Sequence, residues 1–461
     1  MNAILIVLLL AVSGGILFLT PSFAPGALAM CALFSLPTII LLPRSDERTF
    51  LMRLFLAGLI LRLMVGTIIF LGNYQSFFGG DANTYDIFGG SLVLSWHGDD
   101  YHTMQYERFV SSGAGAWGML YLVAAVYELI GDNMLAIQFI NATVGAATAP
   151  VIYYVAQHIF TTKRVSRFAA VLTAFFPSLV LWSSQGLKDG LIVMSLALSM
   201  LAILRLMQRV TTTYVLVLTG GLMVLLSMRF YIFYMMVAAA IGAFVLGAKA
   251  VNTQTVVQRF IAIIAIGLAM TWFGVVRYAG TQFETYGNLE AVHRSRVDMA
   301  RSAESGFGKD VDIRTTEGAL TAIPLGLVYL LFAPFPWQFA SLRQSLALPE
   351  TIIWWFIFPL LILGLWYALK HRLREVSPIL LFTTMLTLAY SVFQGNVGTA
   401  YRQRSQLLVF YFIFIAVGGV LLKEKSENRR ESQIRAKQEL AELQAARVLA
   451  RRQSFGSTGS S

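Results

Sequence analysis

Long apolar blocks with few charges recur along the whole chain, and this pattern constrains the fold more than any other feature. A helix needs about 20 apolar residues to cross a bilayer, whereas a soluble chain shows short amphipathic runs. The stretch Phe50–Leu71 is one such block. Of the 461 residues, 57% are hydrophobic and only 13% are charged, with a mean hydropathy of +0.67. The sequence therefore predicts an all-α polytopic membrane protein.

Basic residues gather in some of the turns between these blocks, and their placement predicts the orientation of the chain. Arg44, Arg48 and Arg53 surround the turn after the second block, which the positive-inside rule places in the cytoplasm. Applied along the chain, the rule predicts about twelve transmembrane helices with both termini in the cytoplasm. The predicted spans cover residues 3–19, 27–42, 50–71, 134–160, 168–182, 190–206, 214–227, a segment ending at 249, 260–276, 352–369, 379–393 and 407–422.

Two polar segments interrupt the predicted membrane domain, which covers residues 1–422. Residues 73–133 form the first external loop, in which the short apolar run Trp117–Ile130 is expected as a helix on the membrane surface. Residues 277–350 form the second external lobe, whose short apolar run stops at a Pro-Phe-Pro sequence and is expected as a re-entrant or surface element. After the membrane domain, residues 423–461 are expected as a cytoplasmic helical tail with a disordered end.

The stretch Phe77–Asp86 carries the principal candidate for chemistry. Asp81 stands where a predicted helix leaves the outer face of the bilayer, and Gly79 and Gly80 before it let the backbone turn tightly and let a ligand approach. Tyr85, four positions later, shares a helical face with Asp81 if the segment is helical. The alternative role for Asp81 is a helix N-cap, although a cap requires neither two glycines nor a place at the edge of the bilayer.

Further charged residues are predicted on the same outer side of the membrane. Such charges are costly near the bilayer and are usually paired in a functional cavity. A carboxylate there can take a proton from an acceptor hydroxyl while cations hold a leaving phosphate, with arginine supplying a planar fork and lysine a point charge. Two alternatives stay open: the cations snorkel at the interface, or the adjacent lysine and aspartate simply pair with each other. The residues are Lys188, Asp189, Arg229, Arg402 and Arg404.

No metal site is predicted, although a divalent metal stays possible. The external segments contain histidines and acids whose spacing matches no metal-binding template, so they are expected to be solvated. The chain has a single cysteine, Cys31, which excludes an internal disulfide, and it has no Walker loop and no dinucleotide-binding glycine pattern. The net charge of +11 is explained by cytoplasmic turns and by groups for anionic lipid or phosphate, not by nucleic acid. The acids and histidines in question are His97, Asp99, Asp100, His102, Asp310 and Asp312.

Several mostly apolar motifs follow one another in a defined order over about a third of the chain. They are Ala116–Leu122, Ile130–Asn133, Ile137–Thr148 with Tyr153, Phe175–Ser178 and Lys188–Asp189. In this order and spacing they resemble the GT-C superfamily of membrane glycosyltransferases, and more narrowly the protein-mannosyltransferase-like branch, family 39. The resemblance covers roughly residues 79–231.

The resemblance implies a sugar donor carried on a polyprenyl phosphate, an acceptor in the periplasm, and inversion at the anomeric carbon. It also implies that Asp81 and Tyr85 belong to the active site, together with the acid that opens a later helix, Asp189. The chain departs from many relatives in having Ala82 where a second acid follows the first. Its C-terminal third, with the predicted turn Gly398–Arg404, looks more like membrane proteins of polysaccharide assembly.

These observations predict an enzyme of the bacterial inner membrane that acts on cell-envelope or exopolysaccharide glycans. It would transfer a hexose or pentose from a polyprenyl-phosphate-linked donor to a periplasmic glycan, lipid or protein acceptor, without a cofactor and in contact with membrane lipids. One alternative is a polymerase or ligase that joins lipid-linked repeat units. Another is a lipid or solute transporter or flippase, which would show a repeated half with broken helices in matching places; the sequence has no such repeat.

Overall fold

The computed structural model describes residues 2–111, 117–246, 264, 267–268, 270–272, 288–302, 305–338 and 342–456, and most of these residues are helical. Apart from an isolated bridge between Gly306 and Asn396, these residues form no β-pairing. The helices are α1 (Asn2–Leu19), α2 (Ala24–Leu41), α3 (Arg48–Leu71), α4 (Gln75–Phe78), α5 (Asp81–Trp96), α6 (Asp100–Ser111), α7 (Trp117–Ile130), α8 (Met134–Phe160), α9 (Lys163–Phe175), α10 (Pro177–Ser183), α11 (Asp189–Gln208), α12 (Thr212–Met228), α13 (Phe230–Leu246), α16 (Leu289–Ser302), α17 (Thr316–Phe332), α18 (Leu342–His371), α19 (Leu373–Phe393) and α20 (Val397–Gly456).

Many of these helices are apolar enough to cross a membrane, as the sequence predicts. Within the described residues, seven pass on length and composition, and an eighth is added if the bent pair α9 and α10 forms one span. Helices α1, α12 and α13 occupy predicted spans as shorter apolar helices. The predicted span 260–276 lies largely outside the described residues. The prediction of an all-α polytopic membrane protein is confirmed.

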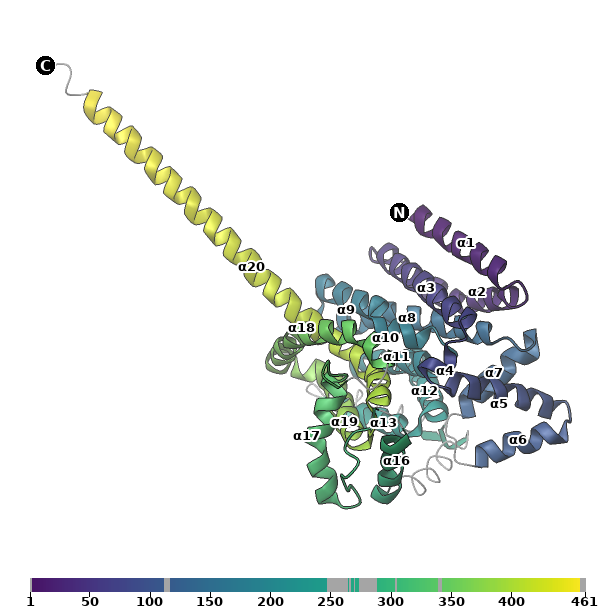
Figure 1. Cartoon of the computed structure of the whole chain (residues 1–461). Coiled ribbons are helices and arrows are strands. Elements are labelled where there is room, and N and C mark those ends of the chain that lie inside the picture. The colour runs from purple at the N-terminus through teal and green to yellow at the C-terminus, as the bar shows by residue number, and fades with distance from the viewer. Residues whose placement is uncertain are drawn as a thin grey trace.

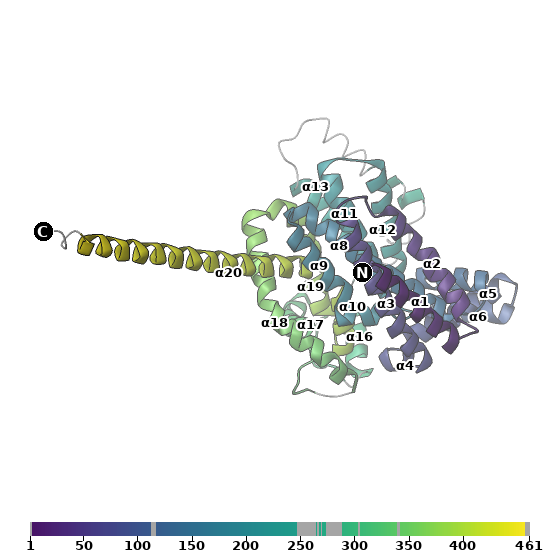
Figure 2. The same ribbon diagram turned by 90° about the horizontal axis from the view of Figure 1, so that it is seen from above.

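Helix α8 forms the centre of the bundle. It packs against α2, α3, α9 and α11, and 89% of its most apolar stretch is buried. Small residues such as Gly145 and Ala149 let the neighbouring helices approach closely. Around this centre, α5 and α6 lie at one side of the molecule, and α20 projects from the other (Figure 1 and Figure 2).

The prediction of one continuous helix over residues 168–182 is wrong. The segment is broken between α9 and α10, which meet at an angle of 52°, because Pro177 cannot donate the helical hydrogen bond at that position. Arg62 of α3 spans the break. Its Nη1 donates to the Ala174 carbonyl before the break at 2.8 Å, and its Nε donates to the Ser183 hydroxyl after it at 2.8 Å.

Helix α20 also differs from the prediction. The turn predicted over Gly398–Arg404 is the first part of α20, which then runs without interruption into the polar tail. Glycine is tolerated so close to a helix start, and the residues from Thr399 to Leu408 are mostly adequate helix formers. Helix α18 likewise begins ten residues earlier than the predicted span 352–369. The cytoplasmic placement of the tail stays a prediction.

Helices α5, α6 and α7 form a lobe that includes the predicted surface helix. The bounds predicted for that helix, Trp117–Ile130, are those observed. Helix α7 packs against α5, and the Tyr127 hydroxyl donates a short hydrogen bond to the Asp86 carboxylate. This contact fixes the first turns of α5, where Asp81 and Tyr85 lie, against the rest of the lobe.

The second polar segment is described in part. It includes α16 and α17, and α17 ends at Phe332, with Ala333 between it and the Pro-Phe-Pro sequence that was predicted to stop it. Backbone hydrogen bonds join Phe307 to Gly395 and Val397 to Ser305, at 2.8 and 3.1 Å. This segment is therefore attached to the chain immediately before α20.

Candidate active site

Three side chains from distant parts of the sequence meet at the start of α5, α11 and α20. Arg402 donates from Nη1 to Asp81 Oδ2 at 2.6 Å, and from Nε and Nη2 to Asp189 Oδ2 at 2.8 and 2.6 Å. Each nitrogen of the guanidinium thus contacts a carboxylate. The sequence predicted Asp81, Asp189 and Arg402 as site residues, and the structure brings them together.

Asp81 is the first residue of α5, and the helix N-cap is Gly80. The alternative interpretation of Asp81 as the N-cap therefore does not apply. Gly79 has a φ of 139°, a conformation that favours glycine, whereas Gly80 has a φ of −65°. Of the two glycines, only Gly79 has a backbone conformation that favours glycine. The Asp81 carboxylate caps no helix and faces Arg402.

Asp189 opens α11 as predicted, and Asn141 of α8 fixes the loop before it. The Asn141 amide donates to the carbonyls of Trp182 and Gln185, at 3.2 and 2.7 Å. Gly190 is required beside it, because a Cβ there would lie 2.2 Å from Asn141 Oδ1. The position of the buried Asp189 carboxylate is therefore set by the central helix of the bundle.

Arg229 lies between α12 and α13 and supplies a second cation to Asp189. Its Nη2 is 3.6 Å from Asp189 Oδ1, and its Nη1 donates to the Tyr231 hydroxyl at 3.2 Å. The Tyr231 and Tyr390 hydroxyls are 3.5 Å apart, and Tyr390 donates to Gln406 Oε1 at 2.5 Å. A buried polar network therefore runs from Asp189 through Arg229 to α19 and α20.

Lys188 and Tyr85 form the remaining part of this cluster. Lys188 Nζ lies 5.9 Å from the centre of the Tyr85 ring, and no carboxylate lies within 4 Å of it among the described residues. The alternative in which Lys188 pairs with Asp189 is not observed. Burial, and next the charge of Arg229, lower the pKa of Lys188 to about 7. Burial, and next the Asp81 carboxylate, raise the pKa of Tyr85, so its hydroxyl stays protonated and able to donate.

The two carboxylates differ in access. The side chain of Asp81 is 51% exposed, whereas that of Asp189 is 1% exposed. The side chains of Arg229 and Arg402 are 9% and 12% exposed. A substrate can therefore reach Asp81 directly, whereas Asp189 is enclosed by the arginines that it pairs with.

Arg404 does not join this cluster. It is fully buried, its Nη1 donates to the carbonyls of Leu331 and Ala333 at 3.0 and 3.3 Å, and its Nη2 is 3.7 Å from Glu350 Oε1. Glu350 also accepts hydrogen bonds from the Tyr401 hydroxyl at 2.8 Å and from the Ser178 backbone. Glu350 thus joins α10, α18 and α20, and its partner Tyr401 is the residue directly before Arg402.

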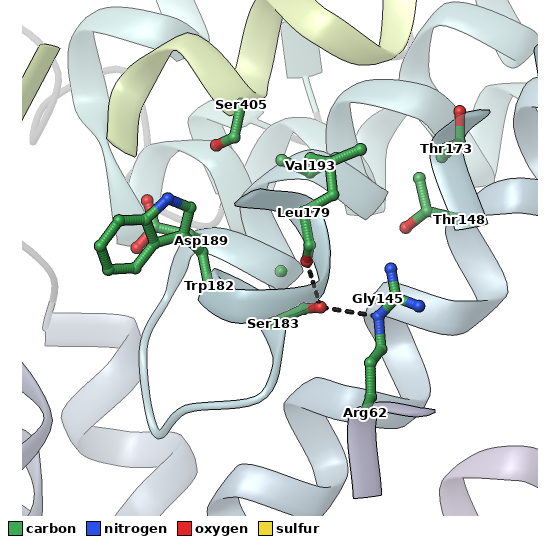
Figure 3. Close-up of a pocket in the computed structure, with 11 residues that line it drawn as sticks. Arg62, Gly145, Thr148, Thr173, Leu179, Trp182, Ser183, Asp189, Val193 and Ser405 are labelled. Carbon is green, nitrogen blue, oxygen red and sulfur yellow. Dashed lines mark hydrogen bonds between the residues drawn. The ribbon is translucent and has the colours of Figure 1, made fainter. Parts of the chain in front are cut away.

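Two buried charges that the sequence reasoning passed over support the site. Glu350 in α18 and Arg62 in α3 are isolated charges inside apolar helices, and that isolation was the available signal. Figure 3 shows Arg62 bonded to Ser183, and Ser183 to Leu179, with Ser405 and Asp189 on the other side of the same cavity. The cavity measures about 20 Å³, enough for a single water molecule.

Four of the six residues weighed as metal ligands take part in ion pairs. His97 lies 3.0 Å from Glu128, and His102 lies 2.9 Å from Asp99. Asp312 contacts Arg314 at 2.6 Å in the second polar segment. Across the part of the chain that the structure describes, no group of three or more His, Cys, Asp or Glu side chains is arranged to hold a metal ion.

Comparison with known proteins gives one family match. Residues 116–277 match the family model described as dolichyl-phosphate-mannose-protein mannosyltransferase. No curated protein sequence matches the chain significantly. The matched segment contains Lys188, Asp189 and Arg229, whereas Asp81 and Arg402 lie outside it.

Two solved structures are similar to the structure of this chain. One is the archaeal oligosaccharyltransferase AglB from Archaeoglobus fulgidus in complex with an inhibitory peptide and a dolichol-phosphate, at 14% identity and a TM-score of 0.46, covering 84% of this chain and 52% of that chain. The other is the apo form of the A. fulgidus oligosaccharyltransferase, at 15% identity and a TM-score of 0.45, covering 82% and 52%. The chain thus spans about half the length of these proteins, and neither assigns a role to any of its residues.

The family match covers residues 116–277, about a third of the chain, and agrees with the resemblance that the motifs predicted over residues 79–231. Together with the apolar helices, it supports a membrane glycosyltransferase of the GT-C type.

Proposed function

We propose that the chain transfers a sugar from a polyprenyl-phosphate-linked donor to an acceptor hydroxyl at the Asp81 cluster. The observation that carries this proposal is the meeting of two carboxylates and three cations at one place: Asp81, Asp189, Lys188, Arg229 and Arg402. The cations exceed the acids, and Lys188 has no carboxylate of its own. An anionic ligand such as a phosphodiester would balance this charge.

In the proposed reaction, Asp81 is the general base. Its exposed carboxylate takes the proton from the acceptor hydroxyl as the acceptor oxygen bonds to the anomeric carbon. The bond between that carbon and the donor phosphate breaks, and its electron pair leaves with the polyprenyl phosphate. The charge on the leaving phosphate is stabilised by Lys188 and Arg229, and displacement from the face opposite the phosphate inverts the anomeric carbon. The Tyr85 hydroxyl can donate a hydrogen bond to the sugar or phosphate.

Asp189 takes a different part in this proposal. Because it is enclosed by Arg402 and Arg229, it would orient the two guanidinium groups and would not touch the acceptor. The two acids would therefore divide the work: the exposed one handles the proton and the buried one holds the cations in place.

The remaining features of the proposed function follow the sequence-based predictions. The active site would face the periplasm of a bacterium, with both termini in the cytoplasm. The acceptor would be a glycan, lipid or protein of the cell envelope or an exopolysaccharide. The dolichol-phosphate and peptide named with the archaeal structure belong to that protein, and the acceptor of this chain is to be identified by experiment.

The proposal is tested with the purified full chain in lipid nanodiscs. A panel of polyprenyl-phosphate-linked hexoses and pentoses is offered with envelope extract as acceptor, and the released polyprenyl phosphate is measured by mass spectrometry. Replacing Asp81 by Asn should lower the rate by about 10²–10⁴-fold, as expected for loss of a general base. The matched control is Glu107→Gln, an exposed acid of the same segment. Full transfer by a normally folded Asp81→Asn chain would refute the assignment.

A further inference from the structure

The position of Arg402 between two carboxylates suggests a role beyond holding a phosphate. Its guanidinium is bonded on one side to Asp81 and on the other to Asp189, with all three nitrogens within 2.8 Å of a carboxylate oxygen. Two acids from separate helices that face one central cation are the arrangement in which a divalent metal ion is commonly held. Here the central cation belongs to the protein itself.

A metal ion does not fit in that place while Arg402 occupies it. Magnesium usually keeps several of its waters and is bound through one or two carboxylates, and the guanidinium between Asp81 and Asp189 fills the space that such an ion would need. Lys188 and Arg229 lie beside the carboxylates as well. A divalent ion added to these three cations would meet strong repulsion.

Arg402 is also held firmly from behind. Its Cζ lies 5.8 Å from the centre of the Trp182 ring, and its neighbour Tyr401 is hydrogen-bonded to Glu350 at 2.8 Å. The side chain is 12% exposed and that of Asp189 is 1% exposed, so the ion pair between these two residues is only weakly screened by water. An always-charged guanidinium in a fixed position provides a permanent local charge.

We propose that Arg402 is a built-in cation that takes the place of a divalent metal ion between Asp81 and Asp189. It joins the two acids, fixes the distance between them, and supplies positive charge at the reaction centre. The catalytic part of this inference rests on the proposed function, which then proceeds without added metal. The structural part, that the two carboxylates form a cation site filled by Arg402, stands independently.

The structural part is tested without any substrate. Arg402→Ala removes the guanidinium and leaves the two carboxylates facing an empty space, so the variant should acquire a site for one Mn²⁺. Binding of Mn²⁺ alone to the full chain in nanodiscs is followed by electron paramagnetic resonance. The wild-type chain should bind no stoichiometric Mn²⁺, and the control Arg402→Ala/Asp81→Asn should lose the site again. Arg402→Gln serves as the second variant if Arg402→Ala fails to fold.

The catalytic part is tested by transfer assays in the presence of EDTA. The wild-type rate should change less than about twofold, whereas Arg402→Ala should lose about 10²–10³-fold and regain about tenfold or more with Mn²⁺. The inference is overturned if EDTA abolishes wild-type transfer and Mn²⁺ restores it. It is also overturned if a folded Arg402→Ala chain binds no more Mn²⁺ than wild type. If Mn²⁺ binding is as expected but the wild-type chain consumes no lipid-linked sugar, the proposed function fails and the assignment of Arg402 as the site cation stands.

Discussion

The buried pair Glu350–Arg404 offers a quantitative test of how the site is supported. Replacing Glu350 by Gln keeps an oxygen that can accept from Ser178 and Tyr401, but it removes the charge that faces Arg404. Arg404 is fully buried and has no other carboxylate within 4 Å in the described structure. Breaking a buried pair in this way costs about 3–5 kcal/mol. We therefore expect Glu350→Gln to lower the Tm by roughly 5 °C or more.

The single cysteine of the chain gives a convenient assay. Cys31 is buried in α2, against Thr143 of α8, so a thiol-reactive fluorogenic dye labels it when the bundle opens on heating. The matched control is Glu427→Gln. It breaks the exposed pair between Glu427 and Arg164, which should cost no more than about 1 kcal/mol.

A double variant separates the ion pair from general damage to the core. Arg404→Met removes the charge that Glu350→Gln leaves stranded, so the double variant should be more stable than the sum of the two single effects predicts. The difference should be about 0.5–3 kcal/mol, the range for residues in direct contact. If the effects simply add, or if Glu350→Gln behaves like Glu427→Gln, the reasoning about this pair is refuted.

Four further predictions concern residues of the site. Asp189→Asn should lower the rate of transfer by at least about tenfold and should also lower the Tm. The reason is that the change leaves Arg229 and Arg402, both buried, without the carboxylate that they pair with. A Tm equal to that of wild type in the dye-labelling assay would contradict this prediction. Lys188 loses its charge as the pH rises through about 7, so the KM for the lipid-linked donor should rise between pH 6 and pH 9, and Lys188→Met should abolish that dependence. Between about pH 7 and pH 10 the unfolded chain holds a proton on Lys188 that the folded chain has lost. The contribution of Lys188 to stability should therefore rise with pH over this range. It is measured as the difference in Tm between wild type and Lys188→Met. Gly190→Ala should cost about 1–3 kcal/mol through its clash with Asn141, whereas Gly80→Ala has open space around it and should leave the Tm unchanged.

The sequence was sufficient for the helices and for most members of the site. The ends of α7, and the start of α11 to within one residue, could be predicted because apolar periodicity and charge change abruptly there. Asp81, Asp189 and Arg402 could each be selected as charges at the ends of apolar runs. Their partnership could not be predicted, because Arg402 follows Asp189 by 213 positions and only the packing of α11 against α20 brings them together.

The failures of prediction have physical causes as well. Arg402 and Arg404 are two positions apart on one helix, so they point in different directions. They could not be separated beforehand because both were predicted to lie in a turn. The break before α10 was marked by Pro177, but the apolar run continues through it and suggests a single helix. Glu350 was overlooked because the predicted span began at residue 352, which left this acid in the second external lobe, whereas α18 begins at Leu342.

Helix α20 is continuous, so the candidate active site and the tail lie on one helix. From Arg402 to Glu442 the helix advances about 1.5 Å per residue, or roughly 60 Å. A force applied to the far end of α20 would therefore act on the same helix that carries the Arg402 guanidinium between Asp81 and Asp189.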